Sequence, residues 1–220
     1  MSTTLCPTRL LFLDTEFTSL GDPWPVQLIS VGLSDAQGHP LFYAEAADFD
    51  PSLAHDFTRR HVIPLLERGA KSLPYAQLCE AFFGAILAQG APCALAADSD
   101  WDWLWIQMMA SRTQDASGPL MLDDPSTLPL WPANLSPRMA KISFPALSPI
   151  EKMACREALS AHFKTRHPHH ALIDAVGNAK GCKAAIEANP GLACDDPSAF
   201  CHVFQQSLKS LCWAPGPAPR

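Results

Sequence analysis

The sequence predicts an α/β fold in which helices flank one central mixed sheet. The first observation is a run of three apolar segments, residues 9–17, 26–33 and 40–44, whose short connections favour an antiparallel meander. The second observation is that helical and strand patterns alternate after this meander, which predicts further strands that join the sheet in parallel.

The first strand is apolar on both faces, which is typical of a strand at the centre of a sheet. Leu11 and Leu13 are expected on one face, and Leu10 and Phe12 on the other, because side chains alternate along a strand. The second strand is also largely apolar, and a turn at residues 35–38 separates it from the third.

Apolar residues at helical spacing predict the helices that cover the sheet. Leu78, Phe82 and Ile86 recur in this way ahead of Gly90, which ends their helix. The elements expected after the meander are a helix at 72–89, a strand at 92–97, and helices at 101–112, 150–163, 169–189 and 198–211.

The length of 220 residues suits a single domain, which is expected to span residues 1–212. The chain contains 21 prolines, roughly twice the usual share of ~5%. They concentrate in residues 114–149, interpreted as a proline-rich insertion, and in residues 213–220, interpreted as a disordered tail.

Composition restricts the location and the partners of the chain. No apolar run reaches the ~20 residues that cross a membrane, and residues 1–9 lack a signal-peptide pattern, so a cytoplasmic protein without a membrane partner is expected. None of the eight cysteines forms a Cys-x-x-Cys pair, which favours buried free thiols. The net charge of −6 argues against a basic groove along nucleic acid, but not against an enzyme that holds a chain end through metal ions.

Two carboxylates end the first strand and indicate a metal site. Asp14 and Glu16 are two residues apart, so they share one face of the strand. Like charges at the end of a buried strand are costly unless a positive group neutralises them, and a divalent cation with oxygen ligands is the simplest candidate. The alternative is a strand end with two solvated acids.

Two later stretches carry residues of the same kind. Residues 98–100, Asp-Ser-Asp, lie between a predicted strand and a predicted helix. Asp174 lies in the first turn of a late helix, after His169. The small Ala171 and Ala175 on that helix would allow a close approach to the sheet, which would bring Asp174 to the first strand's carboxylates.

With these motifs the chain resembles the DEDDh branch of the 3′–5′ exonuclease superfamily, which includes ribonuclease T, oligoribonuclease and proofreading exonucleases. Asp14-x-Glu16 matches the first motif, Asp100 the second, and His169 with Asp174 the third. The form of the second motif is also similar to a small bacterial exoribonuclease branch. The resemblance covers roughly residues 9 to 185.

The chain departs from this family at two positions. Residues 17–19, Phe-Thr-Ser, replace the Thr-Gly found in many relatives, and Asp98 stands where the second motif often has Asn. The second departure leaves Asp98 open as a ligand beside Asp100. The proline-rich insertion has no counterpart in the family.

The resemblance implies a ribonuclease-H-like fold and a metal-dependent 3′–5′ exonuclease that acts on the 3′ end of single-stranded RNA or DNA, with RNA favoured. Two Mg²⁺ or Mn²⁺ ions would be the cofactors. Their ligands would be Asp14, Glu16, Asp100 and Asp174. His169 would be the general base, with His170 as the rival, and relatives suggest a homodimer.

Substrate contacts are expected next to these motifs. Residues that border the first motif would contact the terminal nucleotide: Thr15, Phe17, Thr18 and Trp24. Arg166 belongs to a basic segment that would contact the phosphate backbone. The alternative for Phe17 and Trp24 is ordinary packing, and the alternative for the basic segment is a solvated loop. His55 and His61 are interpreted as ordinary surface or core residues. The alternative function is a catalytically idle module that binds nucleic acid or a protein partner.

Overall fold

The computed structural model describes residues 9–21, 25–116, 125–136, 140–142 and 147–189. The strands are β1 (Arg9–Phe17), β2 (Val26–Asp35), β3 (Pro40–Ala46), β4 (Ser72–Leu73), β5 (Cys93–Ala97), β6 (Asp115–Ala116) and β7 (Ala140–Lys141). The α-helices are α1 (Asp56–His61), α2 (Tyr75–Leu87), α3 (Asp100–Ser111), α4 (Pro149–Phe163) and α5 (Ala171–Ala188). The expected helix at 198–211 and the expected tail at 213–220 lie outside the described residues.

The strands form a mixed sheet with β1 near its centre. β1 pairs antiparallel with β2, and β2 pairs antiparallel with β3. β5 joins β1 in parallel, and β7 joins β5 in parallel. The order across the sheet is β4-β3-β2-β1-β5-β7, with β6 paired to the first residues of β2. The expected mixed sheet is confirmed in this arrangement.

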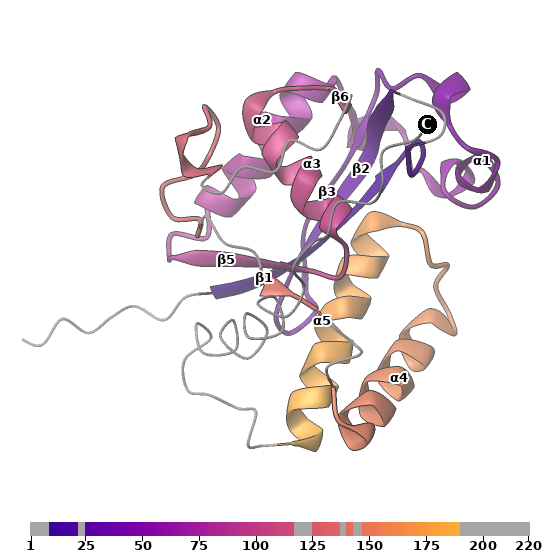
Figure 1. The fold of residues 1–220 in the computed structure, drawn as a ribbon, viewed down its shortest axis with the longest axis vertical. Coiled ribbons are helices and arrows are strands. Elements are labelled where there is room, and N and C mark those ends of the chain that lie inside the picture. The colour runs from indigo at the N-terminus through magenta and orange to yellow at the C-terminus, as the bar shows by residue number, and fades with distance from the viewer. Residues whose placement is uncertain (1–8, 22–24, 117–124, 137–139, 143–146, 190–220) are drawn as a thin grey trace, which may run out of the picture.

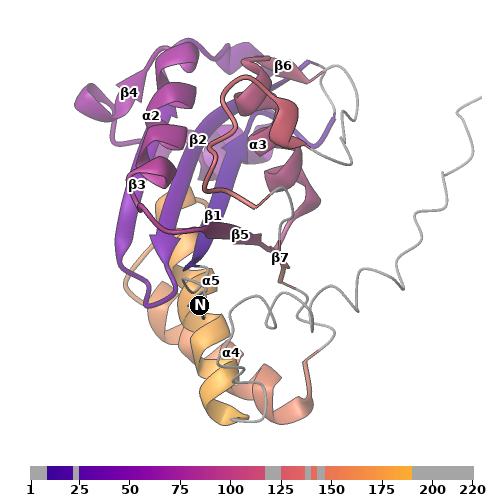
Figure 2. The same cartoon turned by 90° about the vertical axis from the view of Figure 1, so that its left-hand side faces the viewer.

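Helices cover both faces of the sheet, as Figures 1 and 2 show. α2 and α3 lie on one face, α5 lies on the other, and α4 packs against α5. The two faces of β1 follow the predicted alternation, because Leu11 and Leu13 belong to the core with α2 and α3. Phe12 packs instead with Ala179 and Cys182 of α5. The prediction of an α/β chain built around one sheet is therefore confirmed.

The described parts of the proline-rich insertion are joined to the rest of the fold. β6 and β7 both extend the sheet, and Leu135 is buried in the core. The Asn134 side chain donates hydrogen bonds to the carbonyl oxygens of Ile86 and Ala91, at 3.0 and 3.1 Å. The backbone carbonyl oxygen of Asn134 accepts from the Cys93 N–H at 2.6 Å. These bonds attach the insertion to the end of α2 and the start of β5.

Two predictions from composition are tested by the same residues. Cys79, Cys93, Cys155 and Cys182 are buried and carry free thiols, as expected. No helix in the described part of the chain has both the length and the apolar surface that crossing a membrane requires.

Candidate functional site

Asp14 and Glu16 lie where β1 ends, with their side chains on the same face of the sheet as Phe12. Both are partly buried, because β2 and β5 flank β1 and α5 covers this face. The pairing between β1 and β2 shifts its register between Glu16 and Phe17, so regular pairing ends directly after the second carboxylate.

α3 brings Asp102, rather than Asp100, to this strand end. The Ser99 side chain caps the helix by accepting the Trp101 N–H at 3.1 Å, which fixes where the first turn begins. Residues two apart lie on nearly opposite sides of a helix, and Asp102 is 1% exposed whereas Asp100 is exposed. One Asp102 oxygen accepts the Thr15 N–H at 2.9 Å and the Thr15 hydroxyl at 2.6 Å. The other oxygen is buried and has no hydrogen-bond partner.

α5 supplies the third segment of the site. Ala171 and Ala175 are fully buried against the sheet, as their small size predicted. His169 precedes the helix in the left-handed backbone region, with φ of 69°, and its N–H donates to Asp174 Oδ2 at 2.8 Å. The second oxygen of Asp174 is buried without a hydrogen-bond partner.

These three segments form two groups of side chains that could hold a metal ion. In each group, one ligand atom per residue lies within 4.8 Å of the others. The groups are Glu16, His169 and Asp174, and Asp14, Asp98 and Asp102. Asp98 follows β5 directly and is therefore beside Asp14 at the same end of the sheet. The second-motif aspartates in the groups are thus Asp98 and Asp102, in place of the expected Asp100.

The carboxylates raise one another's pKa values. Burial raises the pKa of Asp14 well above its ordinary value, and the charges of Asp102, Glu16, Asp174 and Asp98 add to this effect. For the same two reasons, first burial and then neighbouring charge, the pKa of Glu16 rises to about 8. Burial raises the pKa of Asp102 and of Asp174 to about 7, although hydrogen bonds partly oppose the rise.

The chemistry of this cluster fits a divalent cation. Carboxylate oxygens are the ligands that Mg²⁺ and Mn²⁺ prefer, and buried oxygens of Asp102 and Asp174 have no hydrogen-bond donor. A cation would supply the missing positive partner and would return the raised pKa values toward their ordinary range. The described residues therefore include acidic groups that can hold a metal ion.

His169 is held at the edge of the carboxylates by an aromatic contact. The Phe57 ring meets the His169 ring edge to face, with centroids 4.9 Å apart. His61 lies beyond, with its ring centroid 6.4 Å from that of His169. Burial, and then the nearby His61, lower the pKa of His169, which favours its neutral form near pH 7.

His170 occupies a different environment from its neighbour. Its ring stacks on Tyr43 with centroids 4.3 Å apart, and its Nε2 lies 3.4 Å from a carboxylate oxygen of Glu67. Tyr43 in turn donates to the fully buried Glu45 at 2.9 Å. Of the two adjacent histidines, only His169 belongs to the groups that could hold a metal ion.

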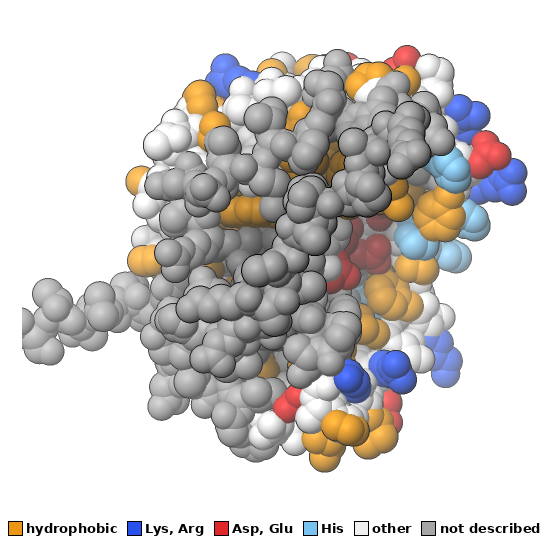
Figure 3. Space-filling view, viewed as in Figure 1, with side chains coloured by type: hydrophobic (Ala, Val, Ile, Leu, Met, Phe, Trp, Pro, Cys, Tyr) orange, Lys and Arg blue, Asp and Glu red, His pale blue; other side chains and the backbone are white. Residues whose placement is uncertain are grey.

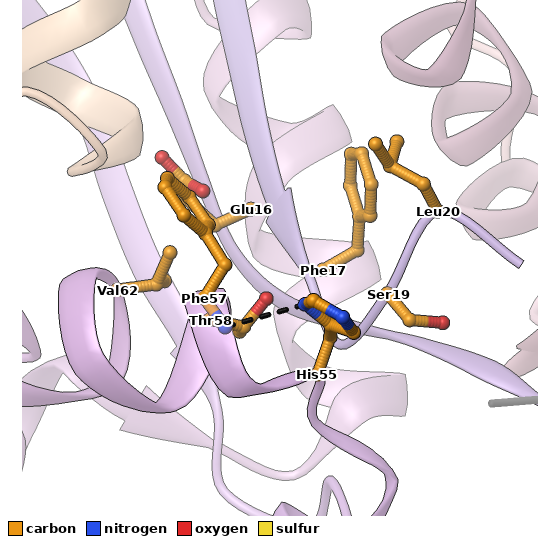
Figure 4. Close-up of a pocket in the computed structure, with 8 residues that line it drawn as sticks. All are labelled: Glu16, Phe17, Ser19, Leu20, His55, Phe57, Thr58 and Val62. Atoms are coloured by element: carbon orange, nitrogen blue, oxygen red, sulfur yellow. Dashed lines mark hydrogen bonds between the residues drawn. The ribbon is translucent and has the colours of Figure 1, made fainter. Parts of the chain in front are cut away.

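A pocket of about 450 Å³ opens beside Glu16 (Figure 4). It is lined by Glu16, Phe17, Ser19, Leu20, His55, Phe57, Thr58 and Val62. Leu20 and Phe57 are 75% and 47% exposed, which is unusual for large apolar side chains. Figure 4 shows Phe57 and Phe17 on opposite sides, with His55 between them. An apolar pocket next to a cluster of perturbed carboxylates is typical of a ligand site.

The expected substrate contacts fall into different environments. Phe17 lines the pocket, and its ring also stacks on Trp101 with centroids 5.2 Å apart. Thr15 is buried and holds Asp102. Thr18 is fully buried, and its hydroxyl accepts the Gln27 N–H at 2.9 Å, so its side chain supports the strand pairing rather than the pocket.

Arg166 and Trp24 were also expected to contact the substrate. Arg166 is exposed in the segment between α4 and α5, and Trp24 lies outside the described residues. Figure 3 shows Asp and Glu side chains in a hollow, with histidine and apolar side chains beside them and Lys and Arg side chains above and below. In this view, histidine and apolar side chains adjoin the acidic hollow, and the Lys and Arg side chains lie beyond them.

Sequence reasoning did not find the contribution of α1. His55 and His61 were expected to be ordinary residues, yet His55 lines the pocket and Phe57 contacts His169. Residues 55–61 show no regular sequence spacing relative to the three motifs that would indicate a shared site. The density of histidine and aromatic residues between positions 55 and 61 was the one available signal.

Neither a scan against protein-family models nor a search of curated proteins found a match for this chain. The described residues establish an α/β chain with a mixed sheet and acidic groups that can hold a metal ion. A more specific function must be inferred from the side chains of the site.

Proposed function

We propose that this protein is a DEDDh-type 3′–5′ exonuclease on a ribonuclease-H-like fold, which hydrolyses single-stranded nucleic acid from its 3′ end and favours RNA over DNA. The observation that carries the proposal is the convergence of carboxylates from β1, β5–α3 and α5 with His169 at one end of the sheet. The three segments are the ones that carry the family-like motifs in the sequence.

The proposed metal ligands are Asp14, Glu16, Asp102 and Asp174, with Asp98 as an additional carboxylate of the cluster. Two Mg²⁺ or Mn²⁺ ions, when bound, would neutralise the phosphate and stabilise the departing oxygen. The proposed ligand from α3 is Asp102, whereas the sequence predicted Asp100. The assignment differs because the rotation of α3 buries Asp102 beside Thr15.

His169 is the proposed general base. Hydrolysis joins the oxygen of a water molecule to the phosphorus and breaks the bond from phosphorus to the 3′ oxygen. The products are a nucleoside 5′-monophosphate and a chain one nucleotide shorter. His169 would take the proton of the attacking water, which a neutral imidazole can accept, and burial keeps this imidazole neutral.

The pocket beside Glu16 is the proposed site of the terminal nucleoside. Its apolar walls suit a base, and stacking on an aromatic ring such as Phe57 tolerates every base. His55 accepts the Phe57 N–H through Nδ1 at 3.2 Å, so the neutral ring carries its proton on Nε2. This donor in an otherwise mostly apolar wall suits an oxygen of the terminal sugar.

The test is cleavage of 5′-labelled single-stranded RNA and DNA of equal sequence with Mg²⁺, Mn²⁺ or EDTA. The proposal predicts a ladder that shortens from the 3′ end, is abolished by EDTA, and forms faster with RNA. Asp174→Asn should remove this activity. Absence of cleavage of both polymers with every metal would contradict the proposal and would favour a binding module without activity.

A further inference from the structure

We infer that Gly32 is a positioning residue of the site, because it sets how closely the helix that carries Asp174 approaches the strand that carries Asp14. The inference rests on the proposed function. A Cβ atom added at Gly32 would lie 2.3 Å from the Leu172 backbone nitrogen and 2.4 Å from the Ala171 carbonyl carbon. These are backbone atoms of α5, so no side-chain rotation could make room.

The place of this contact gives it a role in the site. In the antiparallel pairing of β1 and β2, Gly32 lies directly opposite Asp14. Ala171 and Leu172 are the first two residues of α5, and Asp174 follows in the same turn. The backbone of α5 therefore contacts the sheet immediately beside Asp14. This contact determines the position of Asp174 relative to the carboxylates of β1.

A second contact on the same strand fixes the direction of the helix. Ser34 shares a face of β2 with Gly32, is fully buried, and donates from its hydroxyl to the Ala175 carbonyl oxygen at 3.0 Å. We call Gly32, Ser34, Ala171 and Ala175 the α5–β2 seam. Its residues are small, so the helix and the strand meet with little between their backbones.

A methyl group at Gly32 would move Asp174 and His169, near the start of α5, away from the carboxylates of β1. Ordinary contact begins at 3.4 Å, so α5 would have to move by about 1 Å at its first turn. Asp174 and His169 would move with it, away from Glu16, which stays on β1. Misplacement of reacting groups by about 1 Å can cost about 100-fold in rate, and Mg²⁺ tolerates little deviation from octahedral geometry.

The variant Gly32→Ala tests this role, with Gly84→Ala as the matched control. Gly84 lies in α2 with nothing within 4 Å of an added Cβ atom, so the same methyl group meets no neighbour there. For each protein we would measure Mn²⁺ affinity by calorimetry on the metal-free form, kcat and KM on a single-stranded oligonucleotide, and the melting temperature. All binding would be measured well below the melting temperature of the least stable variant.

Gly32→Ala is expected to bind Mn²⁺ at least about tenfold more weakly and to lose about 100-fold in kcat. KM at saturating Mn²⁺ should change by less than about threefold, because the pocket belongs to β1 and α1, which the seam does not move. Gly84→Ala should match the wild type in Mn²⁺ affinity, kcat and KM, and its melting temperature should be no lower, because alanine favours a helix over glycine. If Gly32 had a purely structural role, Gly32→Ala would lower the melting temperature without a loss in kcat at nearly constant KM.

Ser34→Ala keeps the test decisive if Gly32→Ala does not fold. It removes the hydrogen bond to Ala175 without adding volume, so we expect the same changes in Mn²⁺ affinity and kcat at a smaller size, about threefold. Wild-type Mn²⁺ affinity and kcat in Ser34→Ala, or in a folded Gly32→Ala, would overturn the inference. A wild-type protein that neither binds Mn²⁺ nor cleaves would instead overturn the proposed function.

Discussion

Asp102 and Asp100 differ by two positions in the sequence and by their whole environment in the structure. We expect Asp102→Asn to lower nuclease activity by at least about 100-fold, because it removes a charge that would balance the metal ions. The amide oxygen can still accept from Thr15, so the fold should be retained. Asp100→Asn is the matched control and should stay within about twofold of the wild type in the same assay. Equal losses in both variants would contradict this assignment.

Phe57 lines the pocket proposed for the terminal nucleoside and also contacts His169, the proposed general base. Stacking of a base on an aromatic ring contributes about 1–3 kcal/mol, so Phe57→Ala should raise KM by about tenfold. Because the ring also supports His169, a smaller loss in kcat should accompany it. Steady-state kinetics with single-stranded oligonucleotides would measure both. Leu87→Ala, which removes another exposed apolar side chain outside the pocket, should change neither.

At the scale of secondary-structure elements, the Asn134 side chain makes one of the contacts that attach the insertion to the fold. Asn134→Ala would remove the two hydrogen bonds to the carbonyls of Ile86 and Ala91, which we expect to cost about 1–3 kcal/mol of unfolding free energy in total. The activity of the folded protein should stay unchanged, since these bonds lie at the end of β5 away from its carboxyl end. Chemical denaturation and the cleavage assay would separate the two effects, and a large loss of activity at full stability would contradict the prediction.

The periodicity of the sequence correctly predicted the strands and helices that carry the site. It did not predict which aspartate of α3 points into the site. The alternation of Leu11, Phe12 and Leu13 gave the correct faces of β1, and Ala171 and Ala175 indicated the close approach of α5. The choice between Asp100 and Asp102 depends on the rotation of α3, which its Ser99 cap sets. A match to the family pattern contains no information about that rotation.

The remaining features depend on contacts between distant parts of the chain. Asn134 bonds to residues more than forty positions away, and Phe57 meets His169 across more than a hundred. Neither contact leaves a local pattern in the sequence. No local pattern distinguishes Gly32 from other strand residues, because its role depends on the contact with α5.

For the whole molecule, the raised pKa values predict how stability depends on pH in the absence of metal. Glu16, Asp102 and Asp174 bind protons in the folded state up to about pH 7–8, whereas their ordinary values are 4.5, 3.8 and 3.8. The folded state therefore binds more protons than the unfolded state between about pH 5 and pH 8, and unfolding free energy should fall as pH rises through this range.

The melting temperature of the metal-free protein should accordingly be several degrees lower at about pH 8 than at about pH 5.5. Saturating Mn²⁺ should restore much of the difference, because an ion that binds only the folded state stabilises it. Thermal unfolding across this range, with EDTA or Mn²⁺, would measure both effects. A rise in stability from pH 5.5 to 8 without metal would contradict the account of the cluster.

The most direct measurement is anomalous diffraction from crystals soaked with Mn²⁺ and a nucleoside 5′-monophosphate. The proposal predicts two Mn²⁺ peaks among Asp14, Glu16, Asp102 and Asp174, with the base of the nucleotide in the pocket beside Phe57. Absence of Mn²⁺ from these carboxylates at saturating concentration would contradict the central claim that they form the metal centre of a nuclease.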